Sequence, residues 1–275
     1  MPRSLALLVL LLAVASVRAD RIPGPPPPRP VIATITAEVV ATGTVTEIES
    51  DTVKAKTHPD AKDEIEYKVL VVKIDAPLVG VKKGTTHLKV GVPLSQFEQP
   101  GQPLQKDGQF LLYLTKHSTT NLLLSSHTPL NLAARGADDQ LRRVKVAAAA
   151  ITDPVAALKA KDKDDRVLAA CALAMYYRKT PPNGSGTEAV ARPEEESKLL
   201  LQALAEGEWS TTAPAEAGNP YMVLLGLGLE QEKDGFQMPK SVGEPNVAAA
   251  AKEAFVKWLD GKGKDARVKQ LVPKK

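Results

Sequence analysis

Apolar and polar residues alternate along the first half of the chain. After Val39, the polar residues Thr42 and Thr44 separate Ala41, Gly43 and Val45, and similar runs recur up to about residue 132. Side chains of a strand point to opposite faces in turn, so a period of two residues predicts strands with one buried face. We expect five strands, at residues 39–45, 65–74, 88–92, 110–114 and 122–124.

Two of these runs indicate the shape of the sheet. The second run changes phase, because the alternation through Tyr67, Val69 and Val71 passes to Val72. A change of face inside one strand requires a bulge or a strong bend, and long, bent strands are typical of a small closed barrel. Phe110–Leu114 is apolar at every position, as expected of a strand that is buried on both faces.

The period lengthens to helical spacing after Gly136. Asp153, followed by Pro154, has the features of a helix N-cap with proline in the first turn. The segment 162–179 begins with acids and ends with bases, which matches the helix dipole. We expect a loop over 181–192, a solvated basic tail, and helices over 138–147, 162–179, 193–206, 221–232 and 246–261.

Strands and helices are therefore segregated along the sequence. This order predicts an α+β chain of two domains, a closed β-barrel over residues 31–132 and an all-helical domain over 137–272. Pairs of helices with inner apolar faces are typical of a helical-hairpin array or an irregular bundle.

The N-terminal residues have the pattern of an export signal. Met1-Pro2-Arg3 is followed by an almost unbroken apolar run from Leu5 to Val14. A basic start, a short apolar core and small residues before the cut are what such a signal needs, and the run is too short for a permanent bilayer span. We expect a signal peptide over 1–19, a proline-rich spacer over 20–30, and a periplasmic or secreted mature protein without an integral membrane segment.

Charge and cysteine content narrow the range of partners. The formal net charge is +4, and two of the positive charges belong to the predicted leader. A near-neutral mature chain lacks the basic face of a nucleic-acid-binding protein, so we do not expect a nucleic-acid partner. Cys171 is the single cysteine, which rules out an internal disulfide. Its apolar helical surroundings predict a small buried hydrophobe.

Candidate chemistry is sparse, and we predict no catalytic residue and no cofactor. Zinc sites need three or four converging ligands, often at short spacing, and the four histidines lack such spacing. The best metal pair is His117 with His127, because both are expected to end strands at one rim of the barrel. Ser126 and His127 invite a serine-nucleophile hypothesis, but neighbours in a strand point to opposite faces, and a polar strand end is the favoured interpretation.

The strand half resembles a known module. The segments that carry the resemblance are 37–48, 67–74, 88–92 and 108–114. They resemble the netrin-type module, the OB-like barrel of the tissue inhibitors of metalloproteinases, over roughly residues 31–130. The resemblance implies an OB-fold. In the inhibitors an N-terminal cysteine chelates the zinc of the target, and this half has no cysteine, so the inhibitory chemistry does not carry over.

The helical half has a weaker resemblance. Residues 156–173, with Leu158, Arg166 and the small-residue face Ala169–Leu173, look like one HEAT-type repeat, which implies a HEAT-like domain. The whole chain resembles an uncharacterised family of exported proteins from planctomycete-type bacteria, a resemblance that implies no activity.

Three functions are consistent with these patterns. We favour an exported, non-enzymatic interaction or structural protein of the cell envelope with a protein partner. One alternative is a regulator of extracellular proteases that uses the barrel-edge loop 117–120. The other is an unrecognised hydrolase built on Ser126, His127 or His117.

Overall fold

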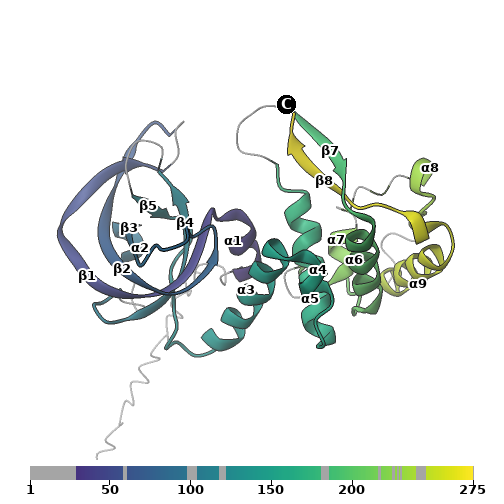
Figure 1. Cartoon of the computed structure of the whole chain (residues 1–275), viewed down its shortest axis with the longest axis horizontal. Coiled ribbons are helices and arrows are strands. Elements are labelled where there is room, and N and C mark those ends of the chain that lie inside the picture. Colours follow the sequence, from purple (N-terminus) through teal and green to yellow (C-terminus); the bar gives the residue numbers. More distant parts are fainter. Residues whose placement is uncertain are drawn as a thin grey trace, which may run out of the picture.

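The computed structural model describes most of the chain after the predicted leader. It covers residues 29–57, 61–97, 104–117, 122–180, 186–215, 218–224, 227, 229, 231–239 and 246–274. The signal peptide over 1–19 and nearly all of the spacer over 20–30 lie outside these residues. The protein is a mixed α+β chain with a six-stranded sheet at one end and most of the helices at the other (Figure 1), which confirms the predicted fold class at this level.

Six strands form one sheet that closes on itself. They are β1 (Val39–Lys56), β2 (Glu64–Val79), β3 (His87–Pro93), β4 (Gln109–Lys116), β5 (Leu123–Ser125) and β6 (Leu130–Asn131). The order is β1-β2-β3-β5-β4-β6, and β1 also pairs with β4, so the hydrogen bonds run around a ring of five strands. The β3–β5 pair is parallel, whereas every other pair is antiparallel. The single turn of helix α2 (Leu94–Phe97) follows β3.

The predicted bend is present where β1 and β2 pair. Val45 pairs with Val72 and Glu47 pairs with Val71, so Thr46 is an additional residue in β1. Its hydroxyl donates a hydrogen bond to the carbonyl of Val71 at 3.1 Å. The phase change in β2 therefore correctly indicated a bulge, although the additional residue belongs to the partner strand, which bends so that its first part also pairs with β4.

Burial of β4 on both faces is also confirmed. Every residue from Phe110 to Leu114 is at most 3% exposed. Leu112 and Leu114 join the core inside the closed sheet, whereas Leu111 and Tyr113 face a second cluster that includes residues of the helices. The outer face of β4 is apolar because helices cover it.

The helical half consists of several short and medium helices. They are α3 (Ala137–Thr152), α4 (Pro154–Leu158), α5 (Lys163–Tyr177), α6 (Glu194–Glu206), α7 (Pro220–Leu224), α8 (Gln231–Asp234) and α9 (Val247–Asp260). The predicted N-cap of α4 is confirmed, since Asp153 accepts a hydrogen bond from the Ala156 N–H at 3.1 Å. Cys171 is fully buried in the core of this half, as predicted. Among the residues that the structure describes, no helix is both long and apolar enough to cross a bilayer.

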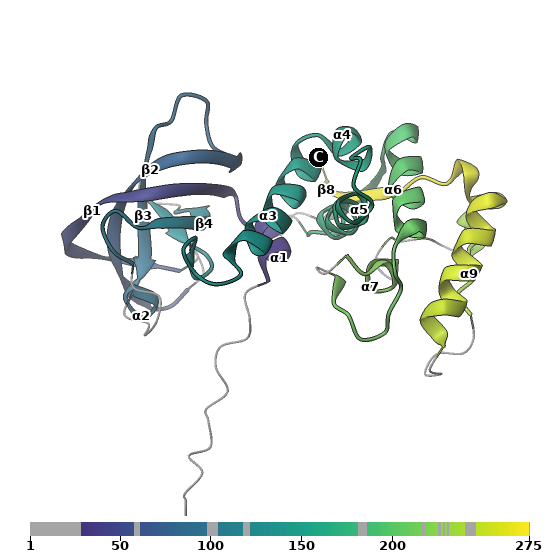
Figure 2. The same ribbon diagram turned by 90° about the horizontal axis from the view of Figure 1, so that it is seen from below.

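The first element, α1 (Pro30–Thr36), corrects the predicted boundary at residue 31. This segment was expected to begin the strand region, but it is a helix packed against α3 and α5. Val31 and Ile35 are β-branched, and residues of this type locally favour a strand over a helix. Their burial against Leu168 of α5 stabilises the helix instead. Figure 2 shows α1 beside α3, between the sheet and the other helices, and the two halves share a core there.

Two further expectations about the helical half are wrong. Residues 137–272 are not all helical, because β7 (Thr187–Ala191), within the expected loop, pairs antiparallel with β8 (Lys269–Pro273), within the expected solvated tail. The helix expected over 221–232 is interrupted, since the described Leu227 and Leu229, which lie between α7 and α8, are not helical. No residue of β7 or β8 is buried. The sequence of either strand therefore shows no regular alternation of apolar and polar residues.

Candidate functional site

A groove of about 500 Å³ lies where α3 meets α4 and the start of α5. Its apolar lining comes from small or partly buried side chains, and three alanines leave the space open. Four charged residues complete the lining. The lining residues are Asp138, Leu141, Arg142, Lys145, Val146, Ala149, Ala157, Ala160 and Asp165.

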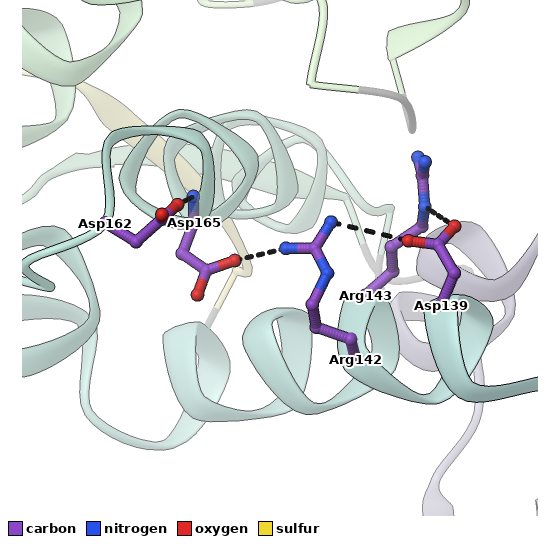
Figure 3. Close-up of polar contacts among 5 residues, drawn as sticks. All are labelled: Asp139, Arg142, Arg143, Asp162 and Asp165. Carbon is purple, nitrogen blue, oxygen red and sulfur yellow. Dashed lines mark hydrogen bonds and ion pairs between the residues drawn. The ribbon is translucent and has the colours of Figure 1, made fainter.

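A network of ion pairs orients one side of this groove (Figure 3). The Arg142 guanidinium forms an ion pair with Asp165 of α5 and a longer one, at 3.5 Å, with Asp139. Arg143 donates to Asp139 at 2.8 Å, and Asp162 caps α5 through the Asp165 N–H at 2.9 Å. The hydrogen bond from Arg143, reinforced by Arg142, lowers the pKa of Asp139. The network therefore links α3 to α5 and holds the Arg142 side chain in one direction.

Two other charges of the groove have no such partner. Within the described ranges, no hydrogen bond or ion pair engages the side chain of Asp138 or of Lys145, and both residues are exposed. They are seven residues apart on α3, which is two turns or about 10 Å along the helix. The groove therefore presents an acid and a base of opposite sign beside an apolar floor.

The predicted metal pair lies in two different environments. His117 follows β4 and lines a hollow with Lys116 and Leu122, whereas His127 packs edge-on against the Tyr113 ring at 5.7 Å. Because β5 runs antiparallel to β4, the two histidines leave this ladder toward opposite ends. Across the described parts of the chain, no group of three or more His, Cys, Asp or Glu side chains is arranged to hold a metal ion.

The Ser126–His127 pair is closer than the sequence indicated. Ser126 lies in a bend after β5, so the rule that strand neighbours face apart does not apply to it. Its Oγ is 3.2 Å from His127 Nδ1, and it also donates to the carbonyl of Tyr113 at 3.0 Å. A hydroxyl has one proton and a carbonyl can only accept, so the proton is directed away from His127.

Burial lowers the pKa of His127, which favours a neutral imidazole. No carboxylate among the residues that the structure describes hydrogen-bonds to His127 or Ser126. A serine nucleophile must donate its hydroxyl proton to the histidine base, and a third group must orient that base. The geometry therefore weighs against the hydrolase hypothesis at this pair. The loop proposed for protease regulation, residues 117–120, is described only at His117.

A buried polar cluster around Glu196 was not predicted from the sequence. Glu196 of α6 is 4% exposed and accepts hydrogen bonds from Arg192 Nε at 2.7 Å, from an Arg192 terminal nitrogen at 2.8 Å and from the Tyr177 hydroxyl at 2.5 Å. Burial raises the pKa of Glu196, but the bonds from Arg192 and Tyr177 outweigh it and the net pKa is lowered. Arg192 also bonds to Gln270 of β8 at 2.9 Å, so the cluster attaches the C-terminal strand to the helices.

A local signal for this cluster is weak. Glu196 is one of three consecutive acids in the first turn of a helix, and such acids are ordinarily exposed. Arg192 stands four residues earlier, at the spacing of a helical ion pair, which is the one hint in the sequence. No protein-family model matches the chain, and no curated protein matches it.

Proposed function

We propose that the chain is an exported, non-enzymatic interaction protein that binds a segment of a protein partner in the groove between α3, α4 and α5. The observation that carries the proposal is the groove itself. It combines an apolar lining with two charges that have no intramolecular partner among the described residues, whereas Ser126, beside His127, directs its hydroxyl proton to the carbonyl of Tyr113.

The proposal includes a finer assignment of both halves. The ring β1-β2-β3-β5-β4 with a helix between β3 and β4 is the arrangement expected of a five-stranded OB-type barrel. The pair α3 and α5, joined by the short α4, supports a HEAT-like helical unit. The apolar run and small residues of the first nineteen positions support export and cleavage near Asp20.

The lining of the groove indicates the chemistry of the partner segment. Amphipathic helices bind in grooves through apolar side chains spaced along one face. A fitting segment has an acid opposite Lys145, a base opposite Asp138 and small or aliphatic residues between them. Opposite charges of this kind add specificity and speed of association more than affinity.

Site-specific photo-crosslinking tests the proposal. A photoreactive residue at Ala149, in the groove, is compared with one at Glu253, an exposed position of α9. In the native host we expect a discrete crosslinked product from position 149 alone. Lys145→Glu should abolish this product, and the crosslinked peptide should carry an acid next to the reacted residue. Equal products from both positions, or a product that survives Lys145→Glu, would contradict the groove as the binding site.

The same preparation tests export. The N-terminal sequence of the accumulated protein should begin near Asp20, and a protein that retains Met1 and its leader would refute this part of the proposal.

A circular dichroism spectrum of Lys145→Glu is the folding control for the crosslinking experiment, since Lys145 is exposed and its replacement should leave the helices intact.

A further inference from the structure

A second hollow, of about 320 Å³, opens at one end of the closed sheet. It lies where β1 begins and where β2 and β4 end. Its apolar lining is Val39, Val81, Leu88, Leu122 and Leu123. Val39 and Leu88 belong to the core inside the sheet, and Val81 and Leu123 pack against that core. The hollow is therefore an open extension of the interior of the sheet.

The turn between β2 and β3 forms one wall and is held close to β1. Gly80 lines the hollow and has a φ of +66°, which side chains disfavour. A Cβ at this position would lie 1.9 Å from the carbonyl oxygen of Glu38. The wall is thus backbone in a fixed position, and the hollow is part of the folded shape of the barrel end.

The rim of this hollow is basic. Lys82, Lys116 and His117 line it, and no carboxylate is among the described residues of its lining. Neither lysine has an ion-pair partner in the part of the chain that the structure describes. Glu38 lies beside the rim, where its carboxylate accepts a hydrogen bond from the Lys116 backbone N–H at 3.0 Å. Two ammonium groups against this one acid leave a net positive rim.

Ligand sites are concave, mostly apolar, provided with a few polar groups, and common in the mouths of β-barrels. An apolar interior with a cationic rim matches an anion that carries a short hydrocarbon chain. If one water takes about 30 Å³, the hollow holds a ligand of roughly ten non-hydrogen atoms. A neutral apolar ligand would leave the lysines unused, and a small inorganic anion would leave the apolar walls in contact with water.

We propose that this hollow binds a small free amphipathic carboxylate, with its chain in the end of the barrel and its carboxylate between Lys82 and Lys116. The Thr85 hydroxyl, also in the lining, is a further donor for the head group. This binding site is separate from the groove between α3, α4 and α5, and it does not depend on a protein partner.

Calorimetric titration of the full chain with octanoate tests the proposal, with acetate and octylammonium as comparison probes. We expect saturable binding of one octanoate, at least tenfold tighter than that of either comparison probe. The double variant Lys82→Gln, Lys116→Gln should weaken octanoate binding at least tenfold. Lys89→Gln is the matched control, because Lys89 is an exposed lysine of β3 that pairs with Glu49 and does not line the hollow.

Thermal unfolding curves of all variants are the control for folding. We expect the lysine variants to keep the unfolding midpoint of the wild type, because these lysines are exposed. Absence of saturable octanoate binding at millimolar ligand would overturn the proposal. So would octylammonium binding as tightly as octanoate, or equal losses from the double variant and from Lys89→Gln. A second variant, Thr85→Trp, fills the hollow without changing its charge and should also abolish binding, and retained binding in that variant would place the ligand elsewhere.

Discussion

Glu196→Gln is expected to destabilise the protein strongly, although it replaces one atom. The carboxylate of Glu196 accepts three hydrogen bonds, two from Arg192 and one from Tyr177. Glutamine keeps one acceptor oxygen and turns an NH₂ group toward these donors. Breaking a buried ion pair by removing one partner costs about 3–5 kcal/mol. The Arg192 side chain is 29% exposed, so water compensates part of this loss, and we expect about 2–4 kcal/mol.

Urea and thermal unfolding measure this loss. For a domain of this size a change of 1 kcal/mol moves Tm by roughly 2–4 °C, so the expected decrease is on the order of 4–16 °C. Glu195→Gln is the matched control, because Glu195 is the preceding residue and its ion pair with Lys159 is exposed. Exposed pairs contribute about 0–1 kcal/mol, and we expect a change of about 0.5 kcal/mol or less in this variant.

The pH dependence of the difference supplies an independent check. Interactions of Glu196 lower its pKa in the folded state from the ordinary value of 4.5. Its contribution is therefore fully present above about pH 4.5, and it is lost as the pH falls through the folded-state pKa. The stability difference between the wild type and Glu196→Gln should shrink as acid is added. Equal effects of the two variants at neutral pH, or a difference that persists unchanged in acid, would refute the reasoning.

Three further changes test other parts of the fold. Cys171 is fully buried, and this burial raises the pKa of its thiol. A thiol reagent at pH 8 should therefore modify Cys171 only at the rate of unfolding. Rapid modification of the native protein would contradict this burial. Gly80→Ala should cost about 3 kcal/mol or more in urea unfolding, because strain at positive φ adds to the contact with Glu38, whereas Gly84→Ala, at positive φ but in open space, should cost about 1 kcal/mol. Lys179→Met should cost about 1–2 kcal/mol, since the ammonium donates to two carbonyls at the end of α1 at 3.0 and 3.1 Å, and an unchanged unfolding midpoint would show that these bonds do not stabilise α1.

The candidate groove illustrates why a site of this kind is hard to predict. Asp138, Arg142 and Lys145 were recognisable as part of a charged helix, and Asp165 as part of an acidic first turn. Charge at such positions is ordinarily a solvated face of a helix. Only the packing of α5 against α3 brings Asp165 to Arg142, twenty-three residues away in sequence, and leaves a groove between them.

Local patterns determined much of the architecture. The period of two residues located the strands β1, β2 and β3, because alternation between two faces is a property of each strand alone, and short apolar runs located β4 and β5. The apolar run of β4 indicated burial on both faces, and the phase change in β2 indicated the bulge opposite it. The predicted N-cap Asp153 marked a helix start for the same reason, since its carboxylate accepts a hydrogen bond from a backbone amide three residues further along.

Tertiary structure decided the elements whose stability comes from distant residues. α1 is helical because Val31 and Ile35 are buried against α3 and α5, against the local preference of β-branched residues. β7 and β8 are far apart in the sequence but pair with each other in the helical half. Gln270 of β8 accepts a hydrogen bond from Arg192, which also donates to the buried Glu196. A local sequence window contains one side of each of these contacts, and the free energy that selects the structure depends on both sides.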